Sequence, residues 1–234
     1  MRFGIISEGK SDQAVLTNIL KGLLDIDKSN ILYIQPENYL DETDLNSPKY
    51  LKNIKSFSNW ELVKYECQSK LKIFDFLNNS IDDKKIIIIQ IDSAECDLKN
   101  YDVERPTKEQ KENYVFELRD RISKKIDEWI SEDINNLIYA ICVEETDAWI
   151  LSIYTNDNKD TGLIIDPKKN LDEILKVKLS KSKLNIINNL NSFESYFEKS
   201  KEFRKYKNLK KFSLKNKSLD VFCNILESKV KTNE

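Results

Sequence analysis

The stretch KIIIIQIDSAECD, residues 85–97, decides the fold of this chain. Its four consecutive isoleucines belong to a short apolar run that is rich in β-branched side chains. Such a run predicts a strand over residues 85–91 that is buried on both faces, as the strands of parallel sheets are. Asp92 follows this strand directly, and Glu95 and Asp97 come soon after it. A carboxylate at the end of so apolar a strand favours a ligand site over ordinary surface.

Acidic groups also follow two further predicted strands, at residues 2–7 and 137–143. Because ligands bind at the carboxyl ends of the strands in open parallel sheets, all three groups are expected at one edge. Carboxylates gathered in this way repel one another unless a cation lies between them, and their hard oxygen atoms suit Mg²⁺ or Mn²⁺. The predicted metal ligands are Glu8, Asp12, Asp92, Glu95, Glu144 and Glu145. Adjacent residues point in different directions, so at most one of Glu144 and Glu145 is expected to face the metal.

Helical patterns alternate with the strands through the first two-thirds of the chain. Apolar residues at helical spacing predict helices over residues 11–24, 58–78, 107–131 and 146–154. A further apolar run predicts a strand over residues 31–35, and the polar residues 37–56 predict a surface loop. This alternation predicts an α/β fold, a Rossmann-like parallel sheet flanked by helices.

The composition changes after residue 156, where the chain becomes rich in lysine and asparagine. Apolar spacing there predicts helices around residues 170–178, 184–190, 192–206 and 217–230. We therefore predict two parts, an α/β domain at residues 1–155 and a helical C-terminal extension at residues 156–234 that packs on it.

The overall composition excludes several classes of protein. The 234 residues include no histidine, which excludes a histidine general base and a Ser-His-Asp triad. The four cysteines have no CxxC spacing, and they predict reduced thiols in a cytoplasmic protein. No apolar stretch approaches the length of a membrane span and no signal peptide is evident, so neither a membrane partner nor secretion is expected.

The turn EGKSD, residues 8–12, admits two interpretations. In the functional one, Glu8 and Lys10 are catalytic, with Lys10 meeting a phosphate group near the amino end of a helix. In the other, this is an ordinary strand-to-helix turn in which Ser11 caps the helix and the acidic residues favour its dipole. The acidic residues after the other two strands also have an ordinary structural interpretation. In it, Asp92 caps the turn after its strand, and Thr146 caps the helix that follows.

The charge of the chain gives no global argument for nucleic-acid binding, since its formal net charge is -2. A local argument comes from the basic run at residues 199–217, in which aromatic residues are interleaved. Such a run fits either a contact with a phosphate backbone or a solvated helix face.

Taken together, the EG-x-x-D turn, the acidic site after an isoleucine-rich strand and a later strand followed by an acidic residue and a tryptophan resemble the Toprim-like superfamily. The resemblance covers residues 1–155 and is greatest to small standalone bacterial proteins related to nucleases of the overcoming-lysogenization-defect type. It implies that Glu8 acts in acid/base chemistry or metal binding, and that Asp92 is the first Asp of a metal-binding DxD pair. The second position of that pair is Ala94, where the chain departs from the pattern, and Glu95 or Asp97 is the candidate substitute. The acidic residue before the tryptophan corresponds to Glu145, with Glu144 and Asp147 as alternatives.

The resemblance implies a Mg²⁺- or Mn²⁺-dependent nuclease that cleaves phosphodiester bonds in DNA or RNA, in defence against phage or mobile DNA. Its predicted catalytic residues are Glu8, Lys10 and Asp92. The rival hypothesis, favoured by Ala94, is a catalytically weakened binding or sensor module within a multi-protein complex. A nucleotide-binding regulator is the third hypothesis, and a partner protein or homo-oligomer stays open.

Overall fold

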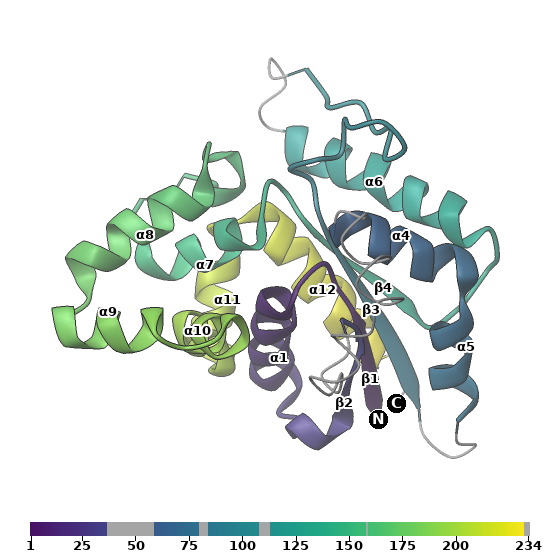
Figure 1. Cartoon of the computed structure of the whole chain (residues 1–234), viewed down its shortest axis with the longest axis horizontal. Coiled ribbons are helices and arrows are strands. Elements are labelled where there is room, and N and C mark those ends of the chain that lie inside the picture. The colour runs from purple at the N-terminus through teal and green to yellow at the C-terminus, as the bar shows by residue number, and fades with distance from the viewer. Residues whose placement is uncertain (37–58, 80–83, 108–112, 158, 232–234) are drawn as a thin grey trace, which may run out of the picture.

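The computed structural model describes residues 1–36, 59–79, 84–107, 113–157 and 159–231 of the chain. Its centre is a four-stranded, all-parallel sheet in the order β2-β1-β3-β4. The strands are β1 (Arg2–Ile6), β2 (Ile31–Gln35), β3 (Lys85–Asp92) and β4 (Leu137–Cys142). Helices cover both faces of the sheet (Figure 1), which confirms the predicted α/β, Rossmann-like fold. The loop predicted at residues 37–56 lies outside the described residues.

The isoleucines of β3 explain why both faces of the sheet are covered. Ile86 and Ile88 belong to the hydrophobic cluster on one face, whereas Ile87, Ile89 and Ile91 belong to the cluster on the other. The first cluster is completed mainly by α1 (Lys10–Leu24) and α12 (Lys217–Lys231). The second is completed by α4 (Asn59–Ser69), α5 (Leu71–Asn78) and α6 (Tyr114–Ile130).

The order of the strands creates a crevice between β1 and β3. From β1 the chain passes through α1 to β2 on one face, and from β3 it passes through α6 to β4 on the other face. The connections therefore leave the adjacent strands β1 and β3 in opposite directions. Such a switch point opens a crevice at the carboxyl ends of the strands, where open α/β sheets bind their ligands. Glu8 follows β1, and Asp92 is the last residue of β3.

The prediction of one helix over residues 58–78 is wrong in one respect, because the structure has two helices there, α4 and α5. The break lies at Lys70, whose backbone is left-handed with φ of 57°. The carboxylate of Glu66 accepts a hydrogen bond from the backbone N–H of Lys72 at 2.9 Å, so it satisfies a free donor at the start of α5. The side chain of Lys70 reaches the carbonyl of Ile130 at 3.1 Å and the carboxylate of Glu132 at 2.7 Å. These tertiary contacts oppose a continuous helix.

Other boundaries differ by a few residues from those predicted. The helix expected from residue 107 is helical from Tyr114, with residues 108–112 outside the described part. Ser11 and Thr146 lie inside their helices instead of capping them. The cap positions are Gly9 for α1 and Glu145 for α7 (Thr146–Tyr154).

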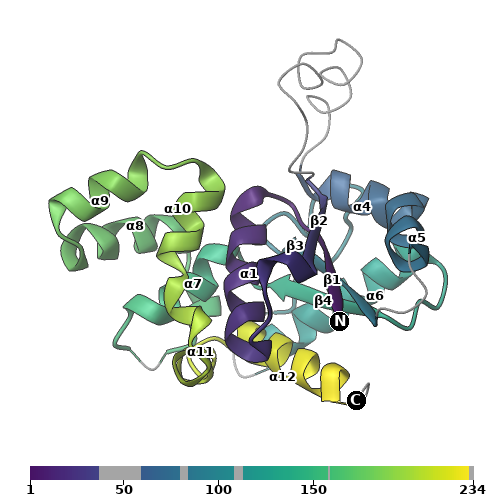
Figure 2. The same cartoon turned by 90° about the horizontal axis from the view of Figure 1, so that it is seen from below.

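The C-terminal part of the chain consists of helices, of which those after residue 191 lie beside α1 and the two before it lie farther away (Figure 2). They are α8 (Pro167–Lys178), α9 (Lys181–Asn188), α10 (Ser192–Lys199), η3 (Lys201–Arg204), α11 (Tyr206–Ser213) and α12. Shorter 3-10 turns are η1 (Lys28–Asn30) and η2 (Thr161–Leu163). The single helix predicted at residues 192–206 is therefore wrong, because the chain bends between α10 and η3. In that bend Asn18 donates to the carbonyl of Phe197 at 2.8 Å and accepts from Arg204 at 2.6 Å.

In the part of the chain that the structure describes, we found no helix with both the length and the apolar character needed to cross a membrane.

Candidate acidic site

An open cavity of about 460 Å³ lies where β1, β3 and β4 deliver their acidic residues. It is lined by Glu8, Gly9, Ser11, Asp12, Asn59, Asp92, Ala94, Glu95, Glu145, Thr146, Asp147, Lys168 and Tyr196. Five of the six predicted metal ligands are therefore brought together, from three separate segments of the chain. Glu144 is the predicted ligand that does not line this cavity.

A hydrogen-bonded network joins the ends of β1 and β3. The carboxylate of Glu8 accepts a hydrogen bond from the backbone N–H of Asp92 at 2.7 Å. In return, the backbone N–H of Glu8 donates to the side-chain carbonyl of Gln90 at 3.1 Å. The amide of Gln90 then donates to Oδ1 of Asp92 at 2.8 Å. This closed set of bonds fixes the Glu8 and Asp92 side chains relative to each other across the crevice.

The helix α7 and the C-terminal extension supply the opposite side of the cavity. Thr146 donates its hydroxyl to Oδ1 of Asp92 at 3.3 Å. Asp147, which is buried, accepts from the hydroxyl of Tyr196 at 2.9 and 3.1 Å through its two carboxylate oxygens. Tyr196 belongs to α10, so the extension contacts the acidic residues directly.

Burial and mutual repulsion raise the pKa values of these carboxyl groups. The pKa of Glu8 is raised to about 8, first by burial and also by the charges of Asp12, Glu95 and Glu145, although the N–H of Asp92 opposes the shift. Burial, opposed by a hydrogen bond from Thr146, raises the pKa of Asp12 to about 6. The metal-free cavity therefore holds protons at neutral pH that exposed carboxyl groups would have released.

The pKa of Asp92 is shifted in the same direction. Burial raises its pKa well above the ordinary value, and the neighbouring charges of Glu8, Asp12 and Asp147 raise it further. A divalent cation would reverse this balance, because it would favour the charged form of every carboxylate around it.

Lys168, in the first turn of α8, is the one basic residue among the residues that line this cavity. Its charge lowers the pKa of both Glu145 and Asp147, although burial raises both values overall. The ammonium group therefore lies near the two acidic residues that α7 contributes. Lys168 is exposed, so its charge stays available to an anion that enters the cavity.

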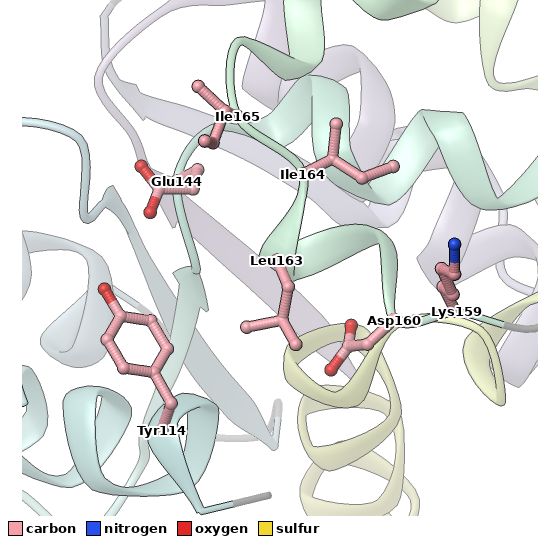
Figure 3. A pocket seen from close by; sticks show the side chains of 7 residues that line it. All are labelled: Tyr114, Glu144, Lys159, Asp160, Leu163, Ile164 and Ile165. Atoms are coloured by element: carbon pink, nitrogen blue, oxygen red, sulfur yellow. The ribbon is translucent and has the colours of Figure 1, made fainter. Parts of the chain in front are cut away.

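Glu144 points into a different cavity, of about 430 Å³, beside Tyr114 and Leu163 (Figure 3). Its backbone is left-handed with φ of 64°, a conformation that is rare for a residue with a side chain. The turn is held because Arg105 donates to its carboxylate at 2.8 Å and Ser93 accepts from its N–H at 2.8 Å. The carboxylates of Glu144 and Glu145 therefore lie in two different cavities, as expected for adjacent residues. Glu145 is the one that lines the acidic cavity.

Lys10 does not line the acidic cavity either. It is the first residue of α1 and is exposed, whereas Asp12 in the same turn is buried. Residues two apart lie on different faces of a helix, so the turn that brings Asp12 to the cavity turns Lys10 away. Asp97, the other candidate substitute for the second Asp, is exposed and lies outside the lining residues.

The chemistry of the donor set fits Mg²⁺ or Mn²⁺, because it consists of carboxylate oxygens. The described side chains do not yet form a closed site, since no three acidic or cysteine residues among them are close enough to enclose a metal ion. Glu8, Asp92 and Glu145 are the residues of the three strand ends that would hold one.

No model of a known protein family, no curated protein and no solved structure matches this chain. The Toprim-like resemblance therefore stays a prediction, and the cavity itself is the observation that bears on function.

Several residues that line or support the cavity are not among the predicted metal ligands and catalytic residues. Asp147 follows the third predicted strand, but an acidic residue in the first turn of a helix is also explained by the helix dipole alone. Lys168 and Tyr196 carry no local signal, because they reach the cavity only through the packing of the extension. Gln90 lies inside the apolar strand β3. A polar residue at a buried strand position is the sequence feature that could have indicated its role in the site.

Proposed function

We propose that this protein is a divalent-cation-dependent phosphodiesterase that cleaves nucleic acid. The observation that carries the proposal is the pairing of Glu8 with Asp92 at the switch point of a parallel sheet, within a cavity lined by further carboxylates. The Toprim-like resemblance adds the biological setting that we propose, which is defence against phage or mobile DNA in the cytoplasm.

In the proposed reaction, Glu8, Asp92 and Glu145 would hold one or two Mg²⁺ or Mn²⁺ ions. Such ions polarise a phosphate group and lower the pKa of bound water. Glu8 is the residue that we assign to the base role, because the chain has no histidine and a bound cation would hold the Glu8 carboxylate in its ionised form. Gln90 and Thr146 hold the Asp92 carboxylate in place through hydrogen bonds of 2.8 and 3.3 Å.

Lys168 takes the role that the sequence suggested for Lys10. It lies near Glu145 and Asp147 and is exposed, so it is suited to neutralise the negative charge of a substrate phosphate. The basic run at residues 199–217 contributes less than its charge suggests. Lys199 is buried, and the guanidinium of Arg204 lies 3.8 Å from the centre of the Phe197 ring.

The second candidate function is a catalytically weakened binding or sensor module. Ala94 favours it, because this residue lines the cavity at the position where the Toprim-like pattern has its second Asp. A module of this kind would bind a cation or a nucleotide phosphate without cleaving, and it would act within a complex of several proteins.

The test is a cleavage assay with purified protein, Mg²⁺ or Mn²⁺, and single- and double-stranded DNA and RNA. We expect Asp92→Asn to lower cleavage at least about 100-fold while the protein stays folded, because it removes a ligand charge at the centre of the network. Asp97→Asn is the matched control, since Asp97 is an exposed acid of the same loop outside the cavity.

The two variants separate the two candidate functions. Cleavage that survives Asp92→Asn would contradict the proposed site. Metal binding that Asp92→Asn weakens, without cleavage of any of the four substrates, would favour the binding module instead.

A further inference from the structure

Arg119, in the middle of α6, is a buried arginine that has no partner among the residues that the structure describes. Only 8% of its surface is exposed. Within the described residues, its guanidinium makes no hydrogen bond and no ion pair, and its Nε is buried without an acceptor. By contrast, Arg105, Arg121 and Arg204 all donate to carbonyl or carboxylate oxygens.

A charge buried in this way is unfavourable unless something compensates for it. Burial lowers the pKa of Arg119 to about 10, so the guanidinium is still charged at neutral pH. Removing a cation from water costs free energy that an opposite charge or hydrogen bonds normally offset. An unsatisfied buried donor in a folded protein therefore needs an explanation, and a bound anion is one.

Arg119 lines a cavity of about 270 Å³ at the edge of the sheet, beside the edge strand β4. Four of the described lining residues form its apolar wall, namely Phe116 from α6, Leu137 and Ile138 from β4, and Ile225 from α12. None of the residues that line it also lines the acidic cavity. The apolar wall is partly open to solvent, since Phe116 is 47% and Ile225 42% exposed.

We propose that this cavity binds a small carboxylic acid, a monoanion whose body is aromatic or branched aliphatic. Its carboxylate pairs with the guanidinium of Arg119, a geometry that arginine favours because both groups are planar and forked. Ser123 and Tyr139 line the same cavity, and the Tyr139 hydroxyl donates a hydrogen bond to Asp127. The apolar body of the ligand packs against Phe116, Leu137 and Ile225.

The charges around the cavity favour a carboxylate over a phosphate. Arg119 is the one cation among the described lining residues, and Asp120 adds a negative charge that is itself paired with Lys124 at 2.7 Å. A dianionic phosphate would meet a single guanidinium and a neighbouring carboxylate. A monoanion matches the one free positive charge.

The test measures the binding of benzoate to the full chain by NMR titration, with benzamide and inorganic phosphate as comparison ligands. We expect benzoate to bind saturably, with a dissociation constant at least about tenfold lower than that of either comparison ligand. Arg119→Met should abolish this preference. Arg121→Met is the matched control, because Arg121 lies on the same helix and pairs with Glu117, outside the cavity.

A second measurement tests the premise that Arg119 is unpaired. Without ligand, Arg119→Met should raise the melting temperature, because it replaces a buried unpaired charge with an apolar side chain of similar length. Arg119→Lys keeps the charge but loses the fork, so it should fold and bind benzoate about tenfold more weakly.

Several results would overturn the proposal. The first is the absence of saturable benzoate binding to the wild type at ~10 mM. The second is equal binding of benzoate by Arg119→Met and the wild type, and tighter binding of phosphate than of benzoate would count equally against it. The third is a lower melting temperature of Arg119→Met, or its failure to fold, since either would show that the guanidinium already has stabilising contacts.

Discussion

Glu8 shows how the surroundings of one residue change its chemistry. The side chain follows β1, accepts a hydrogen bond from Asp92 at 2.7 Å, and lies among acidic neighbours that repel its charge. Its pKa of about 8 replaces an ordinary value of 4.5. Between these two pH values the folded protein keeps a proton that the unfolded chain has released.

The stability of the metal-free protein should therefore fall as the pH rises. Because the folded state binds more protons than the unfolded state from about pH 5 to about pH 8, the free energy of unfolding decreases over this interval. The slope is about 1.4 kcal/mol per pH unit for each such proton. Urea denaturation at a series of pH values measures it.

Glu8→Gln isolates the contribution of this residue. The glutamine carbonyl can still accept from Asp92, but it cannot lose a proton, so the decrease should become shallower. Asp97→Asn should leave the slope of the wild type unchanged, since Asp97 is exposed. Stability that increases from pH 5 to pH 8, or equal slopes in Glu8→Gln and the wild type, would disagree with this account.

At the scale of elements, the contact between α1 and η3 fixes the extension on the α/β part. Gly22 of α1 lies so close to η3 that a Cβ atom there would be 1.8 Å from the carbonyl oxygen of Phe203. Only a glycine allows this approach of two backbones. The same two segments are joined through Asn18 and Arg204, whose hydrogen bond is 2.6 Å.

Gly22→Ala should consequently destabilise the protein by about 3 kcal/mol or more, because the backbones must separate. In a helix without this contact, the same substitution would stabilise by about 1 kcal/mol, so the sign of the effect is diagnostic. Thermal or urea unfolding measures it. Lys10→Ala, at an exposed position of the same helix, should change stability by less than about 0.5 kcal/mol. A stabilising Gly22→Ala would contradict the packing of η3 on α1.

The sequence predicted elements better than it predicted contacts. The strand over residues 85–91 was predictable because four isoleucines in sequence fit only an element covered on both sides. The break at Lys70 was not, because the contacts of Lys70 with Ile130 and Glu132 join residues about sixty positions apart. Local propensity carries no information about such contacts.

The same distinction applies to the acidic site. Five of the six predicted metal ligands line one cavity, because parallel strands deliver the residues after them to one edge of the sheet. The orientation of Glu144 was decided by its left-handed backbone and by Arg105, which no local pattern indicates.

At the scale of the whole molecule, the site belongs to both parts of the chain. The α/β part supplies Glu8, Asp92 and Glu145, while the extension supplies Lys168 and Tyr196. The acidic residues are gathered by the sheet, and the residues that face them depend on how α8 and α10 pack. This division explains why a sequence motif located the carboxylates but not their basic neighbour.

The most direct test of the central claim is the calorimetric titration of metal-free protein with Mn²⁺ near pH 7, in buffers of different ionisation enthalpy. We expect binding by the wild type and by Asp97→Asn, with the release of protons because Glu8 and Asp92, whose pKa values are raised by burial, must both ionise. Asp92→Asn should abolish binding, and Glu8→Gln should lower the proton release. The absence of Mn²⁺ binding to the folded wild type, or equal binding by Asp92→Asn, would contradict a metal site at the ends of β1 and β3.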